Sequence, residues 1–338
     1  MLYGPSRKSI DEVWTANELE KLLNGKWHVA PKSTLWFAET LSFGNFIVND
    51  GRRVIFVANE QPNFLEMLRS SESQVSCVIT SSPIDGLSDN IPQLIVEDTK
   101  VVLGIIAAEV RERFKGKVVA VTGGAGTSIT TKLLHRLFVS DSQVVATKKN
   151  DDSQQGVCLT MAECKWNSDA EACLLEIDSS VFANNFDINN IIKPHICAIV
   201  GTDVDHEILP SVSDTEAAII NAKVCAGIVP GGFAVLNADM RNFDVVLSEV
   251  KKYGAKPIIC GSKKGNYDSY LKASTFSGNS TNVGAVILGK EVIYKIPIIG
   301  KGKVQNSIIA LTIMALLGVK DLEDAAKRLE GFVSKRTV

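Results

Sequence analysis

The feature that most constrains the fold is an alternation of short apolar runs with helical segments from residue 117 onward. Apolar runs bounded by turn signals predict strands at 117–121, 144–147, 172–177, 196–200, 233–236 and 257–259. Helical periodicity between them predicts helices at 130–138, 214–228 and 243–253. Strands that alternate with helices typically form a parallel sheet. We therefore expect an α/β fold, with a mostly parallel sheet flanked by helices on both faces.

The segments on either side of this region differ in character. Before it we expect helices at 16–23, 63–68 and 99–114, strands at 54–57, 75–79 and 94–96, and a loop at 81–86. After residue 268 we expect a hairpin of strands 285–288 and 292–296, turning at Gly289-Lys290, and helices at 304–317 and 322–329. The pattern predicts a small N-terminal α/β domain, residues 1–114, and a central domain, residues 115–338.

The composition excludes several classes of protein. With 36 basic and 38 acidic residues, the formal net charge is −2, whereas a general nucleic-acid binder needs a cationic surface. The longest apolar run, 308–319, is too short to span a bilayer, and the polar start of the chain lacks the apolar core of a signal peptide. Buried thiols are expected at Cys77, Cys158, Cys173, Cys197, Cys225 and Cys260. We expect a soluble, reduced, cytoplasmic protein.

A glycine-rich turn at 122–128 leaves the first strand of the alternating region and enters a helix. Its glycines are Gly123, Gly124 and Gly126. Such a turn directs backbone N–H groups toward a helix N-terminus, where a phosphate is favoured. A P-loop also has a Lys after the last Gly, and then a Ser or Thr that binds Mg²⁺. Ser128 fills the hydroxyl position, but Thr127 stands where the Lys belongs. Taken alone, the turn is also compatible with a tight connection that binds no ligand.

Further motifs accompany this turn in a fixed order. They are the segment 91–99 with 114–117, the set Thr147, Asn150, Gly156, Val157, Leu159 and Thr160, the stretch 230–239, and the stretch 300–306. In order and spacing the chain resembles the Mur ligase family from about residue 16 to residue 332. The family's motifs read T-G-S/T-N-G-K-T, T-x-x-N-x-N-N-x-x-G-V-P-L-T, G-x-x-V-x-N-A-D-D and G-x-H-N-x-x-N-x-x-A-A. The likeness is strongest to the branch that adds D-Ala-D-Ala to the muramoyl tripeptide.

The resemblance implies a chemistry. Mur ligases use ATP to phosphorylate a carboxylate, and an amine then displaces the phosphate to form an amide. Because negative charge on the transferred group must be neutralised, Mg²⁺ and cationic side chains carry much of the catalysis. The implied cofactors are ATP and Mg²⁺. The implied partner is a small molecule or a UDP-sugar-peptide-like substrate, with no nucleic acid, and the N-terminal domain would bind that substrate.

The resemblance also assigns site residues. The implied nucleotide-binding residues are Gly123, Gly124, Gly126, Thr127, Ser128 and Asn306. The implied metal ligands are Ser128, Glu176 and His206, and Lys223 would be carbamylated to bind a second Mg²⁺. Glu176, His206 and Lys223 would thus form the catalytic set. Each also has a plainer interpretation: a charged residue at a strand end, an ordinary His, a solvated helix Lys and, for Asn306, a helix N-terminal residue.

Several positions depart from the family pattern. Besides Thr127, the departures are Ala125 for Asn, Asp152 and Ser153 for the Asn pair, and Gly302 and Lys303 for His-Asn; Asp50-Gly51-Arg52 is only faintly like the family's D-S-R motif. Losing a cation aimed at developing charge costs on the order of 3 kcal/mol. We therefore expect weak or no nucleotide binding. Lys303 is the better candidate to replace the missing cation, because Lys132 is expected to point away.

Mur ligases also continue into a third domain that brings the amine, whereas this sequence ends at Val338. We expect that domain to be absent and the site around Ser128, Glu176 and Asn306 to be exposed, so that a partner chain or a further segment would be needed to complete amide synthesis. The first hypothesis is a diverged ATP-dependent carboxylate–amine ligase. The alternative is a catalytically impaired binding or scaffold module, and a nucleotide kinase is a third option.

Overall fold

The structure of the chain is a computed structural model. It describes residues 10–33, 35–43, 51–58, 64–70, 73–138, 143–148, 151–183, 187–204 and 211–332. The chain divides into two compact units, residues 1–115 with 158–168, and residues 116–157 with 169–338. The division into a substrate-binding domain at 1–114 and an ATP-binding domain at 115–338 stays a prediction.

The first unit is built on a small mixed sheet. Its elements are β1 (Trp14–Thr15), α1 (Ala16–Leu22), β2 (Lys26–Val29), β3 (Phe37–Ala38), β4 (Thr40–Phe43), β5 (Val54–Val57), α2 (Phe64–Ser70), β6 (Val75–Thr80), β7 (Gln93–Ile95) and α3 (Val102–Arg113), the last preceded by a 3₁₀ turn at Thr99–Val101. The strand order is β2-β7-β6-β5-β4, with β2 antiparallel to β7 and the other pairs parallel. Buried Val54, Phe56, Leu68 and Val78 centre its core, because β-branched and aromatic side chains fill a pleated surface.

The second unit holds the alternating region. Its elements are β8 (Lys117–Thr122), α4 (Thr127–Leu137), β9 (Val144–Ala146), α5 (Gln154–Trp166), β10 (Ala172–Glu176), α6 (Ile188–Ile192), β11 (Ile196–Ile199), α7 (Asp214–Ala222), β12 (Phe233–Asn237), α8 (Phe243–Lys252), β13 (Lys256–Gly261), β14 (Ser269–Ser277), β15 (Ser280–Ile287), β16 (Lys290–Ile296), α9 (Lys301–Leu316) and α10 (Leu322–Lys327). Short 3₁₀ turns lie at Ser179–Phe182, Lys223–Cys225 and Arg328–Gly331. Every strand that the alternation predicts is present.

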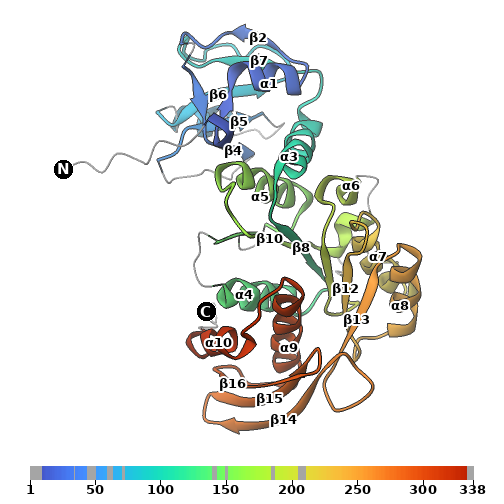
Figure 1. The fold of residues 1–338 in the computed structure, drawn as a ribbon. Helices are drawn as coiled ribbons and strands as arrows, with labels where there is room; N and C mark the ends of the chain where they lie inside the picture. Colours follow the sequence, from blue (N-terminus) through green and yellow to red (C-terminus); the bar gives the residue numbers. More distant parts are fainter. Residues whose placement is uncertain are drawn as a thin grey trace, which may run out of the picture. The chain divides into compact units, whose positions relative to one another are not determined.

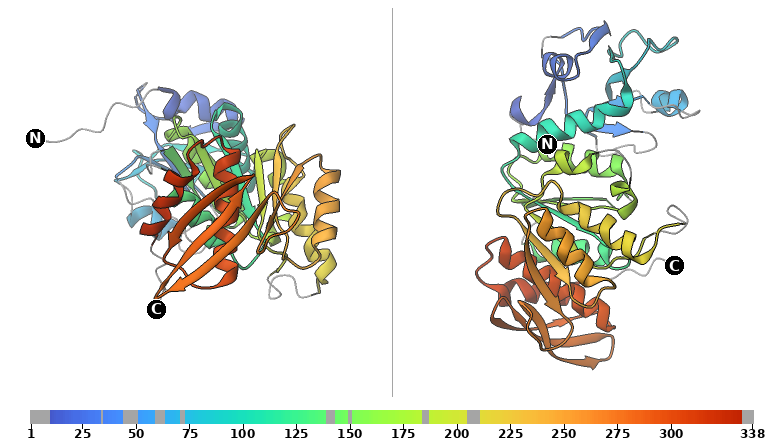
Figure 2. Two further views of the ribbon diagram at one scale, coloured as in Figure 1. Left: turned by 60° about the horizontal axis from the view of Figure 1, so that its bottom comes forward. Right: turned by 90° about the vertical axis from the view of Figure 1, so that its right-hand side faces the viewer.

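In the described residues, nine strands form one sheet in the order β16-β15-β14-β13-β12-β11-β8-β10-β9. All pairs from β9 to β14 are parallel, and β14, β15 and β16 are antiparallel. Helices α4, α9 and α10 pack on one face around buried Leu134, Leu174 and Ile309, while α7 and α8 lie on the other side of β12 and β13 (Figures 1 and 2). The expected α/β fold is confirmed.

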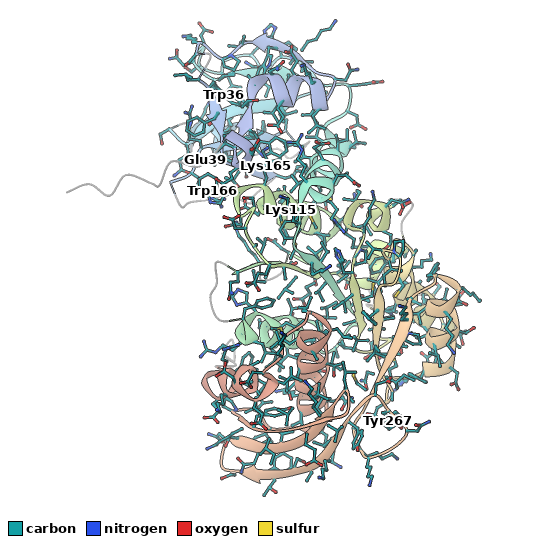
Figure 3. All side chains as sticks on the ribbon, viewed as in Figure 1. Trp36, Glu39, Lys115, Lys165, Trp166 and Tyr267 are labelled. Atoms are coloured by element: carbon teal, nitrogen blue, oxygen red, sulfur yellow. The ribbon has the colours of Figure 1, made fainter. Side chains whose placement is uncertain are left out.

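Helix α5 is notable because its second half, residues 158–168, belongs to the first unit. Near its end (Figure 3), Lys165 has a side chain only 5% exposed, and its Nζ lies 3.0 Å from Glu18 Oε1 and 4.4 Å from the centre of the Trp14 ring. Glu163 accepts a hydrogen bond of 2.6 Å from Arg52 Nη1. Charged side chains thus fasten this half of α5 to the first unit.

The cysteines agree with the expectation of a reduced protein. All seven are free and buried, including Cys164, which the sequence interpretation left out. Burial raises the pKa of the Cys158 thiol, and that of Cys260, to about 12. Within the described ranges, no helix combines the length and apolarity needed to cross a lipid bilayer.

Candidate nucleotide-binding site

The glycine-rich turn joins the end of β8 to the start of α4. Its glycines adopt positive φ angles, 124° at Gly123, 66° at Gly124 and 114° at Gly126, which side chains with a Cβ rarely adopt. A Cβ at Gly123 would lie 2.5 Å from the backbone nitrogen of Gly201, and one at Gly124 would lie 2.7 Å from the carbonyl oxygen of Asp203. Glycine is therefore required both by conformation and by the close approach of a neighbouring loop.

The turn leaves the N-terminus of α4 without a side-chain cap. The cap position is Gly126, which has no side chain to accept from the first amides. The first N–H groups of a helix have no partner within that helix, and together with the helix dipole they favour an anion. Both conditions for a phosphate site are therefore present here, as the sequence predicts.

The turn contacts a strand end through two hydroxyls. Ser128 Oγ donates to Oε1 of Glu176, the last residue of β10, and Thr127 Oγ1 lies 3.3 Å from the same oxygen. Thr127 Oγ1 also lies 3.0 Å from the carbonyl oxygen of Gly124. The backbone N–H of Glu176 donates to Thr147 Oγ1 at 3.0 Å. The structure thus brings together the predicted pair Ser128 and Glu176.

The Glu176 carboxyl lies in a mixed electrostatic environment. Burial raises its pKa, and the charge of Asp152 raises it further, while the Ser128 and Thr127 hydroxyls and the Lys132 ammonium act in the opposite direction. The net effect is a raised pKa. A cation bound beside this carboxyl would favour its charged form.

Asn306 lies beside Gly126, the last glycine of the turn. It is a buried residue of α9, and a Cβ at Gly126 would lie 2.9 Å from its Nδ2. Its neighbour Gln305 donates from Nε2 to the carbonyl oxygen of Cys260 at 2.8 Å. The predicted nucleotide contact Asn306 is therefore placed directly against the glycine-rich turn.

Of the remaining predicted residues, Lys223 is described, and the structure does not join it to this pair. Lys223 lies just after α7, and its Nζ donates to the carbonyl oxygen of Phe182 at 3.2 Å. No hydrogen bond or ion pair joins Lys223 to Glu176, both of which the structure describes. His206 lies outside the described residues.

A buried side chain that the sequence analysis did not single out ties α7 to the turn. Asn221 Oδ1 accepts from Thr122 Oγ1 at 3.3 Å, and its Nδ2 donates to the carbonyl oxygen of Ala217 at 2.9 Å. Its signal in the sequence is a lone amide among the alanines of α7.

The motif at residues 147–160 places carboxylates before α5. Asp151 is buried, and its Oδ1 has no hydrogen-bond partner. The backbone N–H of Asp178 donates to the carbonyl oxygen of Asp152 at 3.0 Å. Burial is the main cause that raises the pKa of each of Asp151 and Asp152. Asp152 thus brings negative charge to positions where the family pattern has a neutral Asn.

The geometry fits a magnesium–phosphate group in part. Among the described residues, no group of three or more His, Cys, Asp or Glu side chains could hold a metal ion. Mg²⁺ is commonly bound by only one or two carboxylates, with substrate phosphates and water completing its shell. Ser128 and Glu176 suffice for that mode, and the uncapped start of α4 suits the phosphates.

A sequence profile of the Mur ligase middle domain matches residues 121–314, more than half of the chain. The chain belongs to the Mur ligase family. A UDP-N-acetylmuramoyl-tripeptide–D-alanyl-D-alanine ligase of Synechocystis is 26% identical over 244 residues, covering 72% of this chain and 50% of the relative. The ligase of the same name from Bacillus subtilis is 24% identical over 265 residues, covering 77% and 54%. The chain thus spans about half the length of these relatives.

Solved structures of Mur ligases share the fold. MurF from Acinetobacter baumannii superposes with a TM-score of 0.78 at 21% identity, covering 96% of this chain and 69% of that one. MurF from Thermotoga maritima, solved in complex with ADP, gives a TM-score of 0.63 at 20% identity, covering 81% and 62%. The Mur ligase architecture therefore extends over most of the chain.

Proposed function

We propose that this chain is a diverged ATP-dependent carboxylate–amine ligase that forms an amide through an acyl phosphate. The observation that carries the proposal is the Ser128–Glu176 contact beside a glycine-rich turn that opens onto an uncapped helix. The names of its relatives suggest the substrates, a UDP-linked muramoyl peptide and a D-alanyl dipeptide. The proposed role is in peptidoglycan synthesis in the cytoplasm, with residues 1–114 binding the UDP-linked substrate.

The chain's own residues divide the work. The backbone N–H groups of 123–128 bind the phosphates, and Asn306 contacts the nucleoside beside Gly126. Ser128 and Glu176 would hold Mg²⁺, which would supply positive charge beside the phosphoryl group. Buried Asn221 fixes Thr122 and so keeps the start of the turn in place.

Lys223 and His206 belong to a second part of the proposal. A carbamate on Lys223 would convert a cation into an oxygen ligand of the kind that Mg²⁺ prefers. The Lys223 Nζ contact to the Phe182 carbonyl would then be exchanged for one to metal. If this is right, bicarbonate stimulates activity in the wild type and has no effect in Lys223→Met.

The proposed reaction requires that an amine be positioned against the acyl phosphate. The chain covers about half of each of these relatives. Positioning and water exclusion contribute on the order of 7–11 kcal/mol to such reactions.

One observation favours an alternative. Thr127 fills the position of the phosphate-loop Lys, and its hydroxyl contacts Gly124 and Glu176 rather than carrying positive charge. A Mur-type scaffold that binds a UDP-sugar or a partner protein without catalysis would tolerate this change. That chain would bind a UDP-linked peptide but release no ADP.

The deciding experiment measures ADP and phosphate release from Mg-ATP, with and without UDP-N-acetylmuramoyl-tripeptide and D-Ala-D-Ala. The ligase hypothesis expects release that depends on the carboxylate substrate and is lost in Glu176→Gln. Release no greater than in Glu176→Gln would overturn it and support the binding module. Calorimetry with Mg-ATP supplies the affinity, which we expect to be weaker than micromolar.

A further inference from the structure

The glycine-rich turn lacks a cation of its own. Thr127 occupies the place of the expected Lys, and its hydroxyl is held by Gly124 and Glu176. Phosphates bound by backbone amides alone leave most of their negative charge uncompensated, and Asp152 adds further negative charge near Glu176. A working site therefore needs a positive side chain from a neighbouring position.

Lys132 is placed to reach this position. It lies four residues after Ser128 in α4, so both residues are on the same face of the helix. Long side chains in helices extend back toward the N-terminus, which for Lys132 is toward the turn containing Ser128. Its side chain is exposed, so its ammonium is accessible to a ligand from solvent.

In the part of the chain that the structure describes, the Lys132 ammonium is also not engaged by another charged side chain. No salt bridge of the described residues involves Lys132. The expectation that the Lys132 side chain points away from the site is the alternative that the binding test below decides.

We propose that Lys132 supplies the positive charge that Thr127 cannot, so that phosphate groups at the turn are neutralised from the second turn of α4. The inference rests on the proposed nucleotide site and names a further binding residue for it. The proposed cation lies further along the same helix than the position of the family's Lys, which Thr127 occupies. With phosphate and Mg²⁺ bound, Ser128 and Glu176 would hold the metal ion, and Lys132 would contact the phosphate oxygens.

Lys303 is the competing candidate. It is exposed and lies one turn before Asn306 in α9, on the side of the turn where Asn306 meets Gly126. The contacts of Asn306 are with the last glycine, whereas those of Glu176 are with the hydroxyls at the start of α4. Lys303 thus lies on the helix of Asn306, the proposed nucleoside contact, whereas Lys132 shares a helix face with Ser128, the proposed metal ligand.

The test uses inorganic pyrophosphate and Mg-ADP as separate probes in calorimetry on the full chain. Lys132→Met should weaken pyrophosphate binding by about tenfold or more, since a charge-assisted contact is lost. Lys132→Arg should retain most of it. The matched control is Lys117→Met, which removes an exposed Lys at the opposite end of β8 and should change binding by less than about twofold.

A charge relocation gives the sharpest readout. The double variant Thr127→Lys with Lys132→Met should regain wild-type pyrophosphate affinity, because the cation returns to the family position. Equal affinity of Lys132→Met and wild type would overturn the inference, as would a loss seen only in Lys303→Met. Absence of any pyrophosphate binding in the wild type would overturn it too.

The two proposals fail in different ways. A Lys132-dependent affinity for pyrophosphate without substrate-dependent ADP release supports this inference and contradicts the ligase. Substrate-dependent ADP release that persists unchanged in Lys132→Met supports the ligase and contradicts this inference. Circular dichroism of each variant confirms that the exposed substitution leaves the fold intact.

Discussion

The Ser128 hydroxyl donates a hydrogen bond to Glu176 Oε1, across a separation of 48 residues in the chain. The contact joins the first turn of α4 to the end of β10, and these are neighbouring elements because β10 pairs in parallel with β8. Ends of parallel strands meet at one edge of a sheet, which is where ligands bind in open α/β folds. The contact supports the proposal that Ser128 and Glu176 hold Mg²⁺ together.

The first prediction concerns the metal dependence of nucleotide binding. In Glu176→Gln the neutral amide no longer supports Mg²⁺, so the gain in ADP affinity on adding Mg²⁺ should fall by about tenfold or more. Calorimetry with and without Mg²⁺ measures it. Glu171→Gln, at the residue directly before the opposite end of β10, is the control and should keep the Mg²⁺ effect. An undiminished Mg²⁺ effect in Glu176→Gln would place the metal elsewhere.

The second prediction concerns pH in the absence of metal. The folded pKa of Glu176 is raised, mainly by burial, so the native state holds this proton more tightly than the unfolded state. Stability contributed by the group is then present below its unfolded pKa and lost as pH rises through the folded pKa. Urea unfolding of the wild type should thus lose stability relative to Glu176→Gln over that acidic interval. A difference that is flat with pH, or of opposite slope, would contradict it.

The elements that could be predicted from sequence are those whose apolar pattern matches one structural period. The strands predicted at 54–57 and 117–121 are β5 and β8, because each is a short apolar run bounded by turns. Helix α5 was not predicted, since buried residues surround its axis and leave no polar stripe. Strand β14 was missed for the opposite reason, because most of it is exposed on both faces. Helix α7 ends at Ala222, earlier than the expected 228.

The residues of the candidate site also differ in how far the sequence could predict them. The glycine-rich turn carries a local signal in its spacing, whereas Glu176 was assigned through the family resemblance, and the structure brings Ser128 and Glu176 into contact. Asn221 could not, because its role depends on a contact with Thr122, 99 residues away in the chain. The influence of Lys132 on Glu176 likewise depends on how β10 lies beside α4, which no local pattern specifies.

The third prediction concerns Gly156, the glycine of the motif at residues 147–160. A Cβ at Gly156 would lie 1.9 Å from the carbonyl oxygen of Asp151, so backbone must shift in Gly156→Ala. We expect a loss of about 1–3 kcal/mol in the free energy of unfolding. The matched variant Gly302→Ala meets no atom within 4 Å and lies in α9, so it should gain about 0.5–1 kcal/mol. Urea denaturation measures both. A neutral Gly156→Ala would show that the loop before α5 relaxes freely.

The fourth prediction concerns the buried ammonium at the end of α5. Lys165 is paired with Glu18, which also accepts from Arg113 at 2.9 Å. Removing one partner of a buried pair leaves a charge uncompensated, so Glu18→Gln should cost about 3 kcal/mol in unfolding free energy. The exposed pair of Lys272 and Glu291 provides the control, because Glu291→Gln should cost at most about 1 kcal/mol.

The pair can be separated from simple loss of packing by a double variant. Glu18→Gln with Lys165→Met removes both charges and keeps apolar volume against Trp14. Replacing a buried ion pair by apolar side chains is often close to neutral, so this variant should recover most of the loss. A double variant as unstable as Glu18→Gln alone would mean that the carboxylate acts through Arg113 instead.

The fifth prediction concerns thiol reactivity. The thiolate is the reactive form of cysteine, and burial raises the pKa of Cys158 and of Cys260 to about 12, so little thiolate forms near neutral pH. Burial raises the pKa of Cys77 as well, and Cys197 behaves similarly beside Cys225. The native chain should therefore react with almost none of its seven thiols in a DTNB titration, and with all seven in denaturant. Because reaction requires opening of the core, its slow rate in native buffer should rise in Gly156→Ala, which loosens the segment before buried Cys158. A thiol that reacts at once in the folded wild type would contradict the buried core described here.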